Sequence, residues 1–104
     1  MNKKLQTAEV QRFLRALLTL ETEEEAGKFF EDVCTVNEIR TMAQRQAVAE
    51  MLRAGSTYVD IAEKTGASTA TISRVNRSLD SGGEGYEIVF GRLAKSGAEG
   101  PDPV

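Results

Sequence analysis

The sequence predicts an all-α protein with six helices. Apolar residues recur at the spacing of one helix face along most of the chain, beginning with a helix over 6–20 that contains Val10, Phe13, Leu14, Leu17 and Leu18. No stretch alternates strictly between apolar and polar residues, as a half-buried strand would. Both prolines lie within the last four residues, where they interrupt no helical pattern.

The second and third helices are predicted from their capping residues. Thr22 is the expected N-cap of the second helix, in a capping box that Glu25 completes. Thr35 and Glu38 repeat this pattern at the start of the third helix. Gly55 is expected to end that helix, because glycine adopts the left-handed conformation that commonly follows a helix C-terminus.

Three more helices complete the predicted fold. Thr57 opens the fourth, Gly66 ends it, and Ser68 caps a fifth helix over 69–79. Residues 81–83 (Ser-Gly-Gly) break the pattern before a sixth helix, which is marked by Tyr86, Val89, Phe90 and Leu93. We expect one all-helical domain over 1–95 and a disordered tail over 96–104, where the composition is poor in apolar residues.

Composition excludes several classes of function. The chain has no histidine and a single cysteine, Cys34, which excludes an internal disulfide, most zinc sites and most nucleophilic triads. No phosphate-binding glycine loop is present. We therefore predict no catalytic residue, no metal site and no enzyme activity.

No apolar run approaches the roughly 20 residues of a membrane span, and no signal-peptide pattern is present, so we expect a cytoplasmic protein.

The net charge of −3 is unevenly distributed. Residues 36–79 hold six basic and four acidic side chains, whereas residues 1–35 hold five and seven, and residues 80–104 hold two and five. A mildly basic segment between acidic flanks can contact phosphates locally. The weak total charge predicts only modest non-specific affinity for DNA.

Residues 57–79 have the pattern of a helix-turn-helix. This motif needs a small residue where its two helices cross, which Ala62 supplies, and a glycine at the turn, which is Gly66. It also needs apolar residues on the inner face of the second helix, which are Ile72 and Val75, while Ile61 adds an inner contact.

The opposite face of the second helix is small, hydroxylic and basic. Small hydroxyl residues near a helix N-terminus allow close approach to base edges, and cations further along reach phosphates. The alternative is that the hydroxyl residues are only a cap and exposed positions, and that the arginines are a solvated face. The predicted DNA-binding residues are Ser68, Thr69, Ala70, Thr71, Ser73, Arg74 and Arg77.

The segment 66–79 (GASTATISRVNRSL) resembles the turn and recognition helix of the Trp repressor family. Residues 52–55 (LRAG) resemble the end of the preceding helix, and the similarity is clearest over 35–79. The resemblance implies an all-α, intertwined homodimer that binds an operator through two helix-turn-helix units.

That family binds tryptophan as a corepressor between the core and the helix-turn-helix. The resemblance places Thr35, Arg45, Arg74 and Ser78 at the family's ligand positions, with the two arginines beside the indole ring. Guanidinium and hydroxyl donors suit a carboxylate.

Three departures from the family pattern bear on the ligand and the operator. Val75 stands where the family has a glycine against the indole, and its branched side chain should fill that space. Asp32 and Cys34 replace leucines that help to wall the pocket, and the residues at 58–60 (Tyr-Val-Asp) replace polar and basic residues that contact DNA. We therefore expect a Trp-repressor-like protein that does not sense tryptophan, with a small carboxylate as the alternative effector.

These observations predict a sequence-specific transcriptional regulator of the repressor type, which binds double-stranded DNA as a homodimer. The alternative is a helical protein–protein interaction module that has kept the fold and lost operator binding. The acidic total charge and the residues at 58–60 favour that alternative. A gel shift on genomic fragments at increasing salt separates the two alternatives. A DNA-binding regulator should bind the fragments and lose affinity for them steeply as the salt concentration rises.

Overall fold

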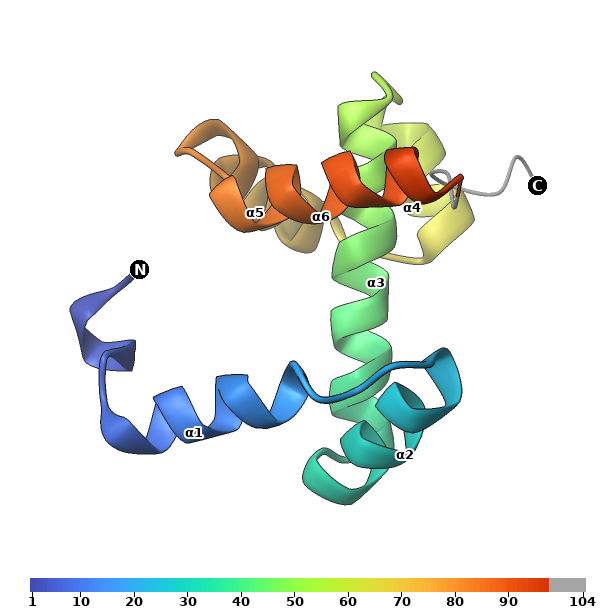
Figure 1. The fold of residues 1–104 in the computed structure, drawn as a ribbon. Helices are drawn as coiled ribbons and strands as arrows, with labels where there is room; N and C mark the ends of the chain where they lie inside the picture. The colour runs from blue at the N-terminus through green and yellow to red at the C-terminus, as the bar shows by residue number, and fades with distance from the viewer. Residues whose placement is uncertain (98–104) are drawn as a thin grey trace. The chain divides into compact units, whose positions relative to one another are not determined.

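A computed structural model describes residues 1–97, and these residues form six α-helices preceded by a short 3-10 helix (Figure 1). The predicted all-α fold is confirmed for this part of the chain. None of its helices is long and apolar enough to cross a membrane. The elements are the 3-10 helix Lys3–Leu5, α1 (Ala8–Leu17), α2 (Glu23–Val33), α3 (Val36–Arg53), α4 (Tyr58–Thr65), α5 (Thr69–Asp80) and α6 (Glu84–Ser96).

The predicted capping residues stand where the helices begin. Thr22 Oγ1 accepts a hydrogen bond from the amide of Glu25 at the start of α2. Thr35 and Glu38 form a reciprocal capping box, in which each side chain accepts a hydrogen bond from the other residue's amide. These bonds satisfy amides that have no partner within the helix, which is why the four-residue pattern locates a helix start.

The ends of α1 and α6 differ from the prediction. α1 is shorter than 6–20: Thr7 caps its start through a hydrogen bond from the Val10 amide to Thr7 Oγ1, and the helix ends at Leu17 with Leu18 as its C-cap. At the other end of the chain, Ser96 is the last residue of α6 and Gly97 is its C-cap. The helix thus extends into the segment predicted to be a disordered tail, and the rest of that segment, 98–104, lies outside the described residues.

The chain divides into two compact units between Ile39 and Arg40, within α3. In the first unit no residue is buried. Its aromatic rings contact one another: the rings of Phe13 and Phe29 stack with centroids 6.0 Å apart. Leu18 is 85% exposed, and Val33 and Val36 are also largely exposed. The apolar stripe predicted for the first helix therefore has no core within its own unit.

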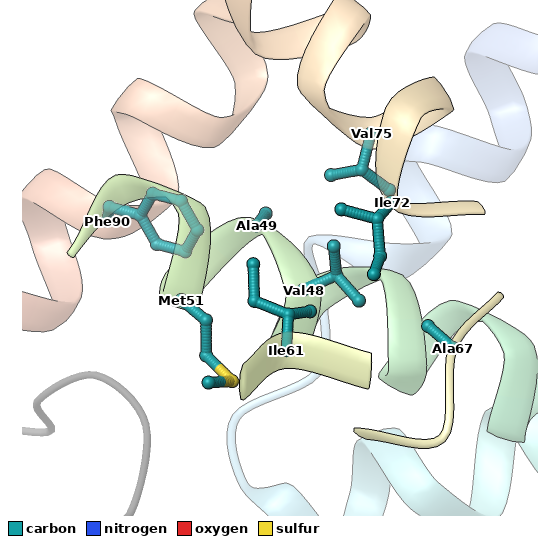
Figure 2. Packing of buried hydrophobic residues seen from close by; sticks show 8 residues of the cluster. All are labelled: Val48, Ala49, Met51, Ile61, Ala67, Ile72, Val75 and Phe90. Atoms are coloured by element: carbon teal, nitrogen blue, oxygen red, sulfur yellow. The ribbon is translucent and has the colours of Figure 1, made fainter. Parts of the chain in front are cut away.

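The second unit contains the hydrophobic core (Figure 2). α3 and α5 contribute most of it, Ile61 comes from α4, and Phe90 comes from α6. Val48, Ile61 and Ile72 have no exposed surface. The core joins the two helices of the predicted motif to the C-terminal part of α3, and its members are Val48, Ala49, Met51, Ile61, Ala67, Ile72, Val75 and Phe90.

A second contact joins α6 to the end of α3, where the two helices cross in Figure 1. The Arg53 guanidinium lies over the Phe90 ring at 5.0 Å from its centroid, and its Nη2 lies 3.5 Å from a carboxylate oxygen of Glu87. Tyr86 stacks on Phe90 with the centroids 5.6 Å apart. Because Arg53 is partly exposed, its attraction to the ring and to the carboxylate contributes only modestly to stability.

Candidate nucleic-acid interface

α4 is held at both ends by the residues that the sequence indicated. Thr57 Oγ1 accepts a hydrogen bond from the Asp60 amide at 3.2 Å and caps the N-terminus. Gly66 has φ +73° and ψ +6°, and its amide donates to the Ala62 carbonyl oxygen at 2.9 Å. This left-handed conformation turns the chain out of the helix, and it is a conformation that side chains with a Cβ disfavour.

The turn between α4 and α5 is closed by polar contacts. Thr65 Oγ1 donates to the Ile61 carbonyl oxygen at 2.7 Å and accepts from the Ala67 amide at 3.1 Å. The carbonyl oxygen of Thr65 accepts a hydrogen bond at 3.1 Å from Nε2 of Gln44, which lies on α3. Ala67, which follows the turn, is buried in the core. The turn is thus attached both to the core and to α3.

Two hydroxyl groups begin α5. Ser68 Oγ accepts a hydrogen bond from the Thr71 amide at 3.1 Å, as the predicted N-cap should. The same hydroxyl donates to Thr71 Oγ1, also at 3.1 Å. Thr71 is half-buried, whereas Ser68 is exposed.

The two faces of α5 differ in exposure as the helical spacing predicted. Ile72 and Val75 are buried in the core, with Val75 3% exposed, and Leu79 packs against this core. Among the predicted DNA-binding residues, Thr71 and Ser73 are half-buried. The exposed ones are Ser68, Thr69, Ala70, Arg74 and Arg77. α5 therefore presents a small, hydroxylic N-terminal end followed by two cations.

The two arginines of this face are available to an anionic partner. Within the described part of the chain, no carboxylate lies within ion-pair distance of Arg74 or Arg77. An exposed guanidinium without a carboxylate partner can form charge-assisted, bidentate hydrogen bonds with a phosphate.

The residues at the predicted ligand positions have separate local roles. Thr35 caps α3 and belongs to the first unit, whereas Arg45, Arg74 and Ser78 belong to the second. Arg45 is half-buried, and Arg74 and Ser78 are exposed. Ser78 Oγ donates to the backbone carbonyl oxygen of Arg74 at 3.4 Å, so the two residues adjoin along α5.

The start of α4 is apolar and exposed. Val59 is 67% exposed and Tyr58 is 38% exposed. By the family resemblance, these two positions correspond to polar and basic residues that contact DNA. In this protein they are occupied by Tyr58 and Val59, which lie at the surface of the helix-turn-helix.

Gln44 was not among the predicted site residues, although a signal for it exists. It lies one helical turn before Val48, and residues four apart share a helix face. Because Val48 is fully buried, the helical period directs Gln44 toward the same side as the core, where it is half-buried. A polar side chain on an apolar face needs a partner, but sequence does not show which one.

The turn, the caps and the two faces of α5 make a complete helix-turn-helix, and comparison with known proteins agrees. Residues 8–94 match the family described as Trp repressor protein. The chain belongs to the Trp repressor family. The resemblance inferred from 35–79 is thus confirmed, and the family match extends well beyond that segment.

Three relatives illustrate the family's range. The uncharacterized protein YerC of Bacillus subtilis (strain 168) is 47% identical over 96 residues, which are 92% of either chain. The crystal structure of a TrpR-like protein from Eubacterium eligens ATCC 27750 has a TM-score of 0.86 at 60% identity, covering 89% of this chain and 96% of the other. That of a "putative Trp repressor" from Staphylococcus aureus has a TM-score of 0.84 at 45% identity, with 95% and 96% covered.

Proposed function

We propose that this protein is a sequence-specific DNA-binding regulator that represses transcription, with α5 as the recognition helix. The observation that carries the proposal is the contrast between the two faces of α5. Ile72 and Val75 fix the helix on the core, and the outward face presents hydroxyl groups and two cations without carboxylate partners. Membership of the Trp repressor family supports the same function.

We expect Thr71 and Arg77 to contribute differently to DNA binding. Thr71→Ala should weaken binding to a selected operator by roughly 1–3 kcal/mol, because a hydroxyl at the N-terminal end of α5 reads a base edge. Arg77→Ala should weaken binding to all sequences alike and flatten the salt dependence, because its guanidinium contacts phosphate. The operator is first selected from genomic fragments with the unmodified protein, and affinities for operator and random DNA are then measured over a salt series.

The outcome separates the proposal from its alternative. A protein–protein interaction module would select no genomic fragment and would show no steep salt dependence. Equal losses on operator and random DNA for both variants would refute the distinction between base and phosphate contacts. Glu63→Ala is a suitable control, because Glu63 is an exposed α4 residue outside the proposed interface.

We propose further that the protein acts as a homodimer. Exposed apolar side chains on α1 and α2, in a unit without any buried residue, favour burial against a second copy. The expected interface comprises α1, α2, α3 and α6, and sedimentation equilibrium at micromolar concentration should give twice the chain mass. The two half-sites should then lie about 34–36 Å apart on the DNA. A stable monomer at that concentration would contradict this prediction.

The protein is expected to bind its operator without tryptophan. Val75 is 3% exposed and packs in the core, so its side chain occupies space beside α5 that the family's glycine leaves free. Arg45, Arg74 and Ser78 retain donors suited to a small carboxylate. Calorimetry with tryptophan should show no saturable heat for the unmodified protein. The heat of tryptophan addition to the Val75→Gly variant is measured under the same conditions for comparison. Tight tryptophan binding by the unmodified protein, together with a rise in operator affinity, would overturn this prediction.

A further inference from the structure

The hydrogen bond between Gln44 and Thr65 differs in kind from the others in the described part of the chain. It joins residues 21 positions apart, whereas the remaining side-chain hydrogen bonds of that part join residues five or fewer positions apart. It also links two elements, since Gln44 lies within α3 and Thr65 is the last residue of α4. Both residues belong to the second unit.

The chemistry of this contact determines its direction. The Thr65 carbonyl is one of the last four of α4, which have no partner within the helix. A carbonyl can only accept, so the amide nitrogen of Gln44 must be the donor. The contact is half-buried, and a buried carbonyl left without a donor destabilises the conformation that buries it.

The side chain of Thr65 also connects the two sides of the turn between α4 and α5. Its hydroxyl donates to Ile61 within α4 and accepts from the Ala67 amide beyond Gly66. The bond from Gln44 therefore ties α3 to a residue that already holds both sides of the turn. Apolar contacts in the core hold the motif without a preferred direction, whereas a hydrogen bond is directional and weakens steeply when misaligned.

We infer that Gln44 is a positioning residue for the recognition helix: it holds the α4–α5 turn on α3 and thereby sets the orientation of α5 for DNA. This inference rests on the proposed DNA-binding function. Gln44 acts through Thr65 and touches no DNA. Its loss should loosen the turn while the core of the second unit stays packed.

The test compares Gln44→Met with Gln46→Met in the full chain. Gln46 is also half-buried on α3, but its amide donates to the Glu50 carboxylate one turn along the same helix and not to the turn of the motif. Hydrogen exchange is measured at the amides of Gly66 and Ala67, both of which are hydrogen-bonded. We expect Gln44→Met to raise their exchange rates about tenfold above those of Gln46→Met. Gln44→Glu should behave likewise near neutral pH and regain protection in acid, because the protonated carboxyl can donate again.

The second arm measures DNA affinity. Gln44→Met should lower affinity for the selected operator about fivefold more than Gln46→Met does. Affinity for random DNA should stay within about twofold, because the phosphate-contacting charges are unchanged. If the unmodified protein selects an operator, two results would overturn the inference. One is equal hydrogen-exchange rates at the turn in Gln44→Met and Gln46→Met, and the other is equal operator affinity of these two variants. If the unmodified protein selects none, the proposed function fails and the inference fails with it, whatever the exchange rates show.

Discussion

Ile72→Ala is expected to lower the free energy of unfolding by about 3 kcal/mol, because truncating a buried isoleucine loses its apolar burial and leaves a cavity. Ile72 has no exposed surface, and its side chain lies beside Val48 of α3 in the core (Figure 2). The total stability of a small domain is only about 5–15 kcal/mol, so the loss is a large part of it. Urea unfolding at fixed protein concentration measures the change.

Val59→Ala is the matched control for this substitution. Val59 is also an apolar helical residue of the helix-turn-helix, but it is 67% exposed. Its truncation should change the free energy of unfolding by no more than about 0.5 kcal/mol. Equal losses in the two variants would show that Ile72 is not part of a packed core.

Gly83→Ala is expected to destabilise the protein by about 3 kcal/mol, from the left-handed backbone and from overpacking together. Gly83 has φ +54°, between the end of α5 and the start of α6. A Cβ at this position would lie 3.1 Å from the Leu79 Cα and 3.3 Å from the carbonyl oxygens of Leu79 and Ser78. These atoms belong to the backbone of α5, which cannot move aside as a flexible side chain could.

Gly66→Ala separates the cost of the left-handed backbone from the cost of overpacking. Gly66 also has a positive φ, +73°, but a Cβ there would meet no atom within 4 Å. Its substitution should therefore cost only the conformational part, about 1–2 kcal/mol. Thermal unfolding of both variants, followed by circular dichroism, gives the comparison. A smaller loss for Gly83→Ala than for Gly66→Ala would argue against a tight junction between α5 and α6.

The role of the α5 residues in DNA binding remains a prediction, but the structure shows how exposed each of them is. Arg74 and Arg77 are exposed, whereas Ser73 is half-buried despite its predicted place on the outward face. Helical spacing assigns a residue to a side of the helix to within a fraction of a turn, so positions at the edge of the face are the least certain. Thr71 is also half-buried, and its hydroxyl accepts a hydrogen bond from Ser68 Oγ.

Local sequence patterns were sufficient to predict the all-α class, the order of the helices and the turn of the helix-turn-helix. These features depend on interactions between residues at most a few positions apart: the caps at Thr22, Thr35 and Ser68, the left-handed glycine at Gly66, and the repeat of apolar residues along each helix. Such interactions are visible as short patterns, because the partners lie close together in the chain.

Which elements meet in the second unit depends on contacts between residues far apart in the chain, and the structure was needed to show them. Gln44 finds its acceptor in Thr65, and Arg53 lies over Phe90, across separations that no local pattern spans. The tertiary structure also showed that the apolar stripe of α1 has no buried residue within its own unit. Side-chain partners distant in sequence depend on how whole helices pack, and apolar spacing indicates that a face will be covered without indicating by what.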